Sequence, residues 1–314
     1  MASNISERMR RALRCCTVAA TLAGVAACYV QAAWADDDDL RHTRSSCLVV
    51  DTDVATDDFR AFAALFPNRD LRAVVVTEGI SSVPRGATAI ALFLASGPSS
   101  APVIPGLAAS APPAYDWLPA ARAAAERING FIAASVPATA SPDKLKLSLF
   151  TALRGCHRID VLVLGPWSSF IEYAPMLRHL LRHVVASGRP LSENNADNFN
   201  CVYDQPACGK ADRFLRNVRR AVWVDLPADG SSYPPTQEMV DQLAGAGMPG
   251  VLKAALNADP STWNVGTRLW DDSAALYVLH PDLFKVSGAH FEPAVDEATL
   301  RSELLKATNA TPAD

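Results

Sequence analysis

Short, unbroken apolar runs recur along this chain, and each is followed by a stretch with helical spacing of apolar residues. Strands buried on both faces of a parallel sheet have such unbroken runs, whereas half-exposed strands alternate. The predicted strands are Leu48–Val50, Ala73–Val76, Val103–Ile104, Ile159–Leu164, Val184–Val185 and Ala221–Val224. Helices are predicted near Phe59–Phe66, Ala87–Ala95, Ala120–Ala134, Phe170–Leu181 and Glu238–Leu243. This alternation predicts an α/β fold: an open, mostly parallel sheet with helices on both faces.

The length of the chain favours a single large domain. Its 314 residues are 49% hydrophobic and 20% charged, which is enough for one complete core. No internal repeat or long linker divides the sequence, so we expect one domain over residues 36–314. The proline-rich, aromatic stretch Ala109–Pro119 is typical of a long surface loop or lid.

The first 35 residues have the organisation of an export signal. Four arginines between positions 8 and 14 precede the apolar run Cys15–Cys28, and Ala33–Ala35 offers an A-x-A cleavage site. The run is short for a membrane span. We therefore expect a signal peptide over residues 1–35 and an exported protein, either periplasmic or secreted.

A second processing route stays open at Cys28. The segment Val25–Cys28 also resembles a bacterial lipobox, and lipidation there would attach the protein to a membrane, which is the one case in which we expect membrane association. Removal of residues 1–35 takes away one Glu and four Arg, so the formal charge falls from −4 to −7. An acidic exported chain without a basic stripe is not expected to bind nucleic acid.

Four cysteines remain outside the signal segment: Cys47, Cys156, Cys201 and Cys208. In an oxidising compartment they allow three disulfide pairings. No C-x-x-C spacing is present among them, as a tetrahedral zinc site would require. The sequence therefore favours structural disulfides.

Four aspartates, Asp51, Asp53, Asp57 and Asp58, fall within eight positions at the end of the first predicted strand. Ligands of open parallel sheets bind at the carboxyl ends of strands. Capping of the following helix accounts for one or two acids, but four partly buried carboxylates repel each other. A hard cation such as calcium would offset their charge. The cluster therefore predicts a metal site, with helix capping as the alternative.

Two other acidic motifs fit less well. An EF-hand loop requires a ligand and a glycine where this chain has Ala55 and Thr56. The DxDx[TV] motif of haloacid-dehalogenase-type phosphatases is matched by "DTDVA" at its two acids but not at its last position. A DxD-type phosphatase remains a weaker alternative.

The chain resembles the calcium-dependent nucleoside hydrolases, the inosine–uridine-preferring family, at five segments in the same order. The first family motif, DTDPGxDDA, aligns without a gap with "DTDVATDDF". The others resemble "VVVTEGISS", "VLVLGPWSSF", "NFNCVYDQPAC" and "LWDDSAALYVL". These segments span Asp51 to about Leu279. The resemblance implies a nucleoside hydrolase-like fold with a Rossmann-like core, and calcium-dependent cleavage of the N-glycosidic bond of a small-molecule nucleoside.

The resemblance also implies roles for individual residues. The calcium shell would consist of three carboxylates and one main-chain carbonyl, those of Asp53, Asp58, Asp271 and Leu164. Asp53 would in addition accept a proton from the attacking water. Asp57 and Asn200 would hold the ribose, and Asn198 takes the place of a glutamate that contacts the 5′-hydroxyl.

Several positions depart from the family pattern. Val54-Ala55 replaces a Pro-Gly pair, so the turn must form without the conformational freedom of glycine. Ile80 replaces an asparagine, and Trp270 replaces the histidine that is often the acid for the leaving group.

Trp270 has two interpretations. It is either a packed core residue or, as in the purine-specific branch of the family, an aromatic face that stacks on a purine base. In the second case Trp117, or Tyr115 beside it, would cover the other face of the base, and purine nucleosides would be preferred. The alternative to an enzyme is a catalytically degenerate domain that binds a ligand or acts as an effector. The sequence leaves the oligomeric state open, a homo-oligomer included.

The expected site also bears on the disulfides. Cys47 and Cys156 each precede a strand that would deliver a metal ligand, and such strands should be neighbours in the sheet. Cys201 and Cys208 are close in sequence, beside the sugar-binding segment. We predict the pairs Cys47–Cys156 and Cys201–Cys208.

Overall fold

The computed structural model describes residues 46–97, 99–110, 112–132, 142–193, 198–227, 233–260 and 268–311. All of these belong to one compact unit. The predicted signal peptide (1–35) and the lipobox cysteine Cys28 lie outside the described residues.

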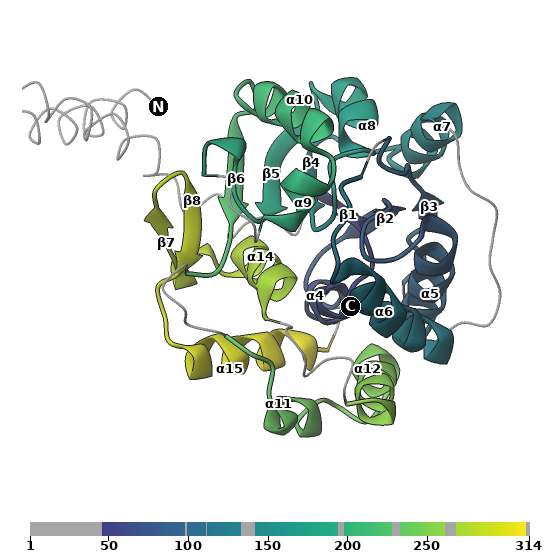
Figure 1. Cartoon of the computed structure of the whole chain (residues 1–314), viewed down its shortest axis with the longest axis vertical. Helices are drawn as coiled ribbons and strands as arrows, with labels where there is room; N and C mark the ends of the chain where they lie inside the picture. Colours follow the sequence, from purple (N-terminus) through teal and green to yellow (C-terminus); the bar gives the residue numbers. More distant parts are fainter. Residues whose placement is uncertain are drawn as a thin grey trace, which may run out of the picture. The chain divides into compact units, whose positions relative to one another are not determined.

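The centre of the described fold is one eight-stranded sheet with strand order β3-β2-β1-β4-β5-β6-β8-β7 (Figure 1). Its strands are β1 (Cys47–Thr52), β2 (Leu71–Val76), β3 (Val103–Pro105), β4 (Ile159–Val163), β5 (Leu181–Ser187), β6 (Arg220–Val224), β7 (Phe284–Ser287) and β8 (His290–Pro293). Only β7 and β8 pair antiparallel. From the β1–β4 pair, chain order runs outward in opposite directions. This pair is the topological switch point, where ligand sites form in open α/β sheets.

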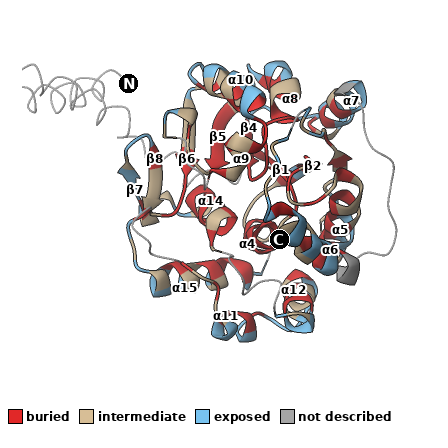
Figure 2. Cartoon of the chain, in the orientation of Figure 1, coloured by how far each residue is buried: buried red, intermediate tan, exposed pale blue. Residues whose placement is uncertain are grey.

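Helices cover both faces of the sheet and build two separate cores. They are α4 (Thr56–Leu65), α5 (Val83–Ala95), α6 (Leu118–Ile132), α7 (Pro142–Ala152), α8 (Phe170–Leu177), α9 (Phe199–Tyr203), α10 (Gln205–Leu215), α11 (Gln237–Asp241), α12 (Gly247–Ala258), α14 (Trp270–Leu279) and α15 (Glu297–Thr308). One core packs Leu48 and Val50 of β1 against α4, α5, α12, α14 and α15. The other packs Val49 and Val161 against α7, α8 and α10. Figure 2 shows the central strands buried between these layers.

The predicted open, mostly parallel α/β sheet is confirmed, and each of the six predicted strands is present. The β7–β8 hairpin was not predicted. The helix predicted over Phe170–Leu181 ends at Leu177, and Leu181 is the first residue of β5. Pro175 lies in the last turn of this helix and has no N–H to continue the hydrogen-bond ladder.

Both predicted disulfides are confirmed. Cys47 at the start of β1 is bonded to Cys156 just before β4, with 6.0 Å between their Cα atoms. Cys201 in α9 is bonded to Cys208 in α10, with 5.1 Å between Cα atoms. In the part of the chain that the structure describes, no helix combines the length and apolarity that crossing a bilayer requires.

Candidate metal and substrate site

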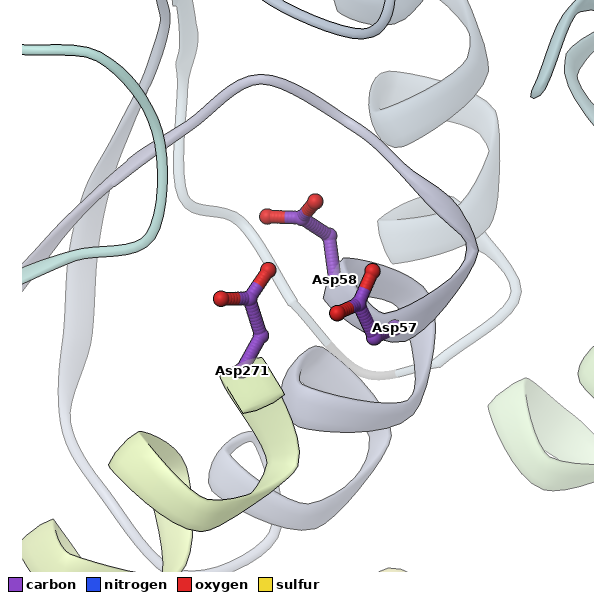
Figure 3. A group of neighbouring side chains, drawn as sticks. All are labelled: Asp57, Asp58 and Asp271. Atoms are coloured by element: carbon purple, nitrogen blue, oxygen red, sulfur yellow. The ribbon is translucent and has the colours of Figure 1, made fainter. Parts of the chain in front are cut away.

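Three buried carboxylates converge beside the switch point. Asp57 and Asp58 lie in the first turn of α4, directly after the β1–α4 turn, and Asp271 lies in the first turn of α14. One oxygen from each can be chosen so that all three lie within 4.8 Å of one another. Figure 3 shows the three side chains directed toward a common space. The sequence interpretation had assigned Asp57 to the sugar, and the structure groups it with Asp58 and Asp271.

A buried ion pair fixes the two helices that carry this cluster. Arg60 of α4 donates from Nε to Oδ1 of Asp272 at 2.9 Å and from Nη2 to Oδ2 at 2.8 Å. Nη2 also donates to the carbonyl of Arg268 at 3.2 Å. Arg60 follows Asp57 by one helical turn and Asp272 follows Asp271, so the pair sets the distance between the two halves of the cluster. The sequence interpretation missed it, although the consecutive acids Asp271 and Asp272 were a signal.

The turn between β1 and α4 contains a valine in the left-handed region. Val54 has φ of 57° and is fully buried. A β-branched residue rarely adopts this conformation because Cβ approaches the backbone too closely. Asp58 braces the turn by accepting a hydrogen bond from the Ala55 N–H at 2.7 Å and one from the Thr52 hydroxyl. The turn therefore forms without glycine, at a steric cost that neighbouring hydrogen bonds offset.

Asp53 is held by main chain from two neighbouring loops. Its Oδ2 accepts a hydrogen bond from the Ile80 N–H at 2.8 Å. A Cβ at Gly79 would lie 2.1 Å from this oxygen, and a Cβ at Gly165 would lie 2.7 Å from the Asp53 nitrogen. Only glycine fits at these two positions. Because position 80 contributes its N–H rather than its side chain, isoleucine can stand there.

Burial strongly perturbs the carboxylates of the site. It raises the pKa of Asp53 to about 7, and the charge of Asp57 adds to this. Burial also raises the pKa of Asp57. It raises the pKa of Asp58 and of Asp271 well above the ordinary value, and the charges of neighbouring aspartates raise these two pKa values further. Arg60 is the cation that acts on Asp57, but it is already bonded to Asp272. The cluster thus combines hard oxygen donors with uncompensated negative charge, which fits a divalent cation such as calcium.

Two of the residues implied for the sugar, Asn200 and Asn198, are hydrogen-bonded to main-chain carbonyls. The carbonyl of Leu164, which follows β4, accepts a hydrogen bond from Nδ2 of Asn200 at 2.7 Å. The Leu164 N–H donates to the carbonyl of Asp51 at 2.7 Å. Asn198 is buried and donates from Nδ2 to the carbonyl of Arg189 at 2.7 Å. The structure therefore brings Leu164 and Asn200 together. The amide nitrogen of Asn198 is bonded to the main chain of Arg189.

Aromatic side chains form a small cluster on the loop before α6 and on α9. Trp117 lies 5.2 Å from Tyr115 and 5.4 Å from Phe199 between ring centroids, and Phe199 lies 5.0 Å from Tyr203. Trp117 is 46% exposed, so part of its surface is available to a ligand. The role of Phe199 in this cluster was not predicted.

Trp270 begins α14, directly before Asp271, and is partly buried. The guanidinium carbon of Arg268 lies over its ring, 5.6 Å from the ring centroid. Trp270 also packs against the core that contains Leu48 and Val50, so it is in contact with both this core and the guanidinium of Arg268.

Sequence comparison gives no match to a protein-family model or to a curated protein. Solved structures do match. The inosine-uridine preferring nucleoside hydrolase from Bacillus anthracis is 14% identical with a TM-score of 0.56, over 84% of this chain and 99% of its own. An inosine-guanosine nucleoside hydrolase is 14% identical with a TM-score of 0.66, over 85% and 99%. A purine-preferring ribonucleoside hydrolase from Gardnerella vaginalis is 16% identical with a TM-score of 0.54, over 84% and 98%.

These matches extend along nearly the whole of each solved chain, and their identities are too low to carry more than the fold. They agree with the resemblance found in five sequence segments. Over about 85% of its length, the chain has the fold of the nucleoside hydrolases.

Proposed function

We propose that this protein is a calcium-dependent nucleoside hydrolase that prefers purine nucleosides. One observation carries the proposal: three buried aspartates meet at the switch point of a nucleoside hydrolase fold. The proposed metal ligands are Asp53, Asp58, Asp271 and the Leu164 carbonyl, and Asp57 adjoins them. Burying this many carboxylates without a cation would lower the stability of the fold, which favours a role of the cluster in binding a cation.

Asp53 is proposed as the general base. When bound, calcium supplies a Lewis acid that makes a nearby water more acidic. Asp53 has a pKa of about 7 in the metal-free protein, and its Oδ2 is held by the Ile80 N–H. A carboxylate fixed in this way can accept the proton of an attacking water. The remaining carboxylates would stabilise the positive charge that develops on the sugar as the glycosidic bond breaks.

Ribose binding is assigned to Asp57 and Asn200, with Asn198 nearby. Asp57 is 8% exposed, so it can reach a ligand at the edge of the cluster. Asn200 spans from α9 to the Leu164 carbonyl and so links the sugar segment to the metal segment. Asn198 lacks the negative charge of the glutamate that the family has there, which should weaken the contact with the 5′-hydroxyl.

Trp270 is proposed to stack on the purine as it leaves, with Trp117 over the other face. A purine can be protonated on its ring, so departure does not require a side-chain acid at this position. A base stacked on an aromatic ring gains about 1–3 kcal/mol. Export is part of the proposal, and it is supported by the signal-like segment and by two disulfides.

Hydrolysis by the purified protein tests the proposal. Inosine, guanosine, adenosine, uridine and cytidine are each incubated with protein and calcium, or with protein and a chelator, and free base and ribose are measured. Calcium-dependent release of base, fastest from a purine nucleoside, is expected. Asp53→Asn should abolish it, while the exposed control Asp241→Asn should not. Calcium binding without turnover of any nucleoside would instead support a non-catalytic binding or effector protein.

A further inference from the structure

We propose that Ser81 and Asn129 are positioning residues that hold Val54 in its left-handed conformation and thereby place Asp53 for metal binding. The inference rests on the proposed metal site, but it concerns two residues to which the family resemblance assigns no role: Ser81, which lies within the segment "VVVTEGISS", and Asn129, which lies outside all five segments.

Ser81 is bonded to both carbonyls that flank the left-handed residue. Its N–H donates to the Asp53 carbonyl at 3.0 Å, and its hydroxyl donates to the Val54 carbonyl at 2.6 Å. Together they fix the peptide units on both sides of the Val54 Cα. The neighbouring Ile80 N–H holds the Asp53 carboxylate at the same time. One short loop, residues 79–81, therefore controls both the backbone and the side chain of Asp53.

Asn129 orients the Ser81 hydroxyl. Its Nδ2 donates to Ser81 Oγ at 2.8 Å, which leaves the hydroxyl hydrogen directed to the Val54 carbonyl. Asn129 is 1% exposed, and its Oδ1 has no hydrogen-bond partner among the described residues. Burying an amide with one of its polar atoms unpaired costs stability. Its contact with Ser81 explains why an amide, rather than an apolar side chain, occupies this point in α6.

The two hydrogen bonds from Ser81 are needed because position 54 is a valine. Glycine adopts positive φ as readily as negative φ, whereas valine does so only under restraint from its surroundings. Without the Ser81 hydroxyl, Val54 can relax toward negative φ. That rotation would move Asp53 away from Asp58, because the two carboxylates are linked by this turn.

The test compares the single variant Ser81→Ala with the double variant Ser81→Ala, Val54→Gly. Calcium affinity of the purified, chelator-treated protein is measured by titration calorimetry, and thermal unfolding in chelator reports on the fold. Ser81→Ala should weaken calcium binding by about 10- to 100-fold, the range for residues that orient metal ligands. Asn129→Leu should weaken it in the same direction, by less. Thr88→Ala, which removes a hydroxyl of α5 bonded to Pro84, is the matched control and should bind calcium as the wild type does.

The double variant Ser81→Ala with Val54→Gly separates positioning from simple packing. Glycine adopts positive φ without the Ser81 hydrogen bond, so the double variant should regain calcium affinity. It should do so even though it loses the buried Val54 side chain and unfolds at a lower temperature. An affinity as weak as that of Ser81→Ala alone, or an unchanged affinity in Ser81→Ala, overturns the inference. A wild type that binds no calcium overturns both this inference and the proposed metal site. Normal calcium results without nucleoside cleavage overturn only the proposed activity.

Discussion

Arg60 of α4 and Asp272 of α14 form a buried, two-bond ion pair at the base of the aspartate cluster. Their side chains are 2% and 0% exposed. An arginine–carboxylate pair with two parallel bonds fixes orientation as well as distance. The pair therefore determines how closely the first turn of α4, with Asp57 and Asp58, approaches the first turn of α14, with Asp271.

Asp272→Ala should lower the free energy of unfolding by about 3–5 kcal/mol, because it leaves the Arg60 charge buried without its partner. It should also weaken calcium binding, because the freed guanidinium competes for Asp57. Urea unfolding and calorimetry measure the two effects. The control is Asp212→Ala, which breaks an (i, i+4) pair with the largely exposed Arg216 and should cost less than about 0.5 kcal/mol. Equal losses in the two variants would show that the buried pair has no special role.

Calcium should stabilise the protein more at pH 8 than at pH 6. Burial raises the pKa of Asp53 to about 7 from an ordinary value of 3.8, so its deprotonation disfavours the folded, calcium-free state. The associated stability is complete below about pH 4 and is lost as the pH rises through about 7. Calcium compensates the charge that appears in this range. Scanning calorimetry with calcium or chelator gives the increase in Tm at each pH, and an increase that is equal at both, or larger at pH 6, would contradict the prediction.

Trp270→Ala should lower kcat for inosine by roughly 5- to 150-fold, the equivalent of about 1–3 kcal/mol of stacking, and change KM less. Stacking that strengthens as the base departs affects the transition state more than the bound substrate. Trp270→Phe keeps an aromatic face and should retain more activity. Steady-state kinetics with inosine and uridine provide the measurement, and a wild type that cleaves uridine faster than inosine rules out this role.

Replacing both Cys47 and Cys156 by serine should lower the free energy of unfolding by about 4–5 kcal/mol. The bond closes a loop of 109 positions, and the entropy that a cross-link removes from the unfolded chain grows with loop length. The Cys201–Cys208 bond closes a seven-position step and should contribute only about 2–2.5 kcal/mol by the same relation. Denaturant unfolding of the two double-serine variants compares them, and the reverse order would refute the entropic explanation.

The sequence predicted the inner sheet because its strands are covered on both faces and are therefore unbroken apolar runs. The β7–β8 hairpin escaped prediction because its strands are four residues each and contain exposed polar positions such as Lys285. At the site, the acids were found by their density and by motif resemblance. The sequence showed only that Val54-Ala55 replaces a Pro-Gly pair, and it could not place Val54 in the left-handed region, because propensity alone disfavours a left-handed valine. The Arg60–Asp272 pair depends on the docking of distant helices, so the consecutive acids Asp271 and Asp272 could not by themselves identify Arg60 as the partner.

Arg60 and Asp272 lie 212 positions apart in the chain, and the aspartates beside them are as widely separated. A contact between such distant segments requires the closure of a long loop, and the entropy lost in closing it opposes the contact until neighbouring interactions have formed. Such contacts therefore form late in folding. An incomplete chain cannot hold the proposed cation before α14 is present, and by then nearly the whole domain is present. Cation binding would then act as a final step that locks a fully assembled molecule, and a chain truncated before α14 should neither bind the ion nor gain its stabilisation.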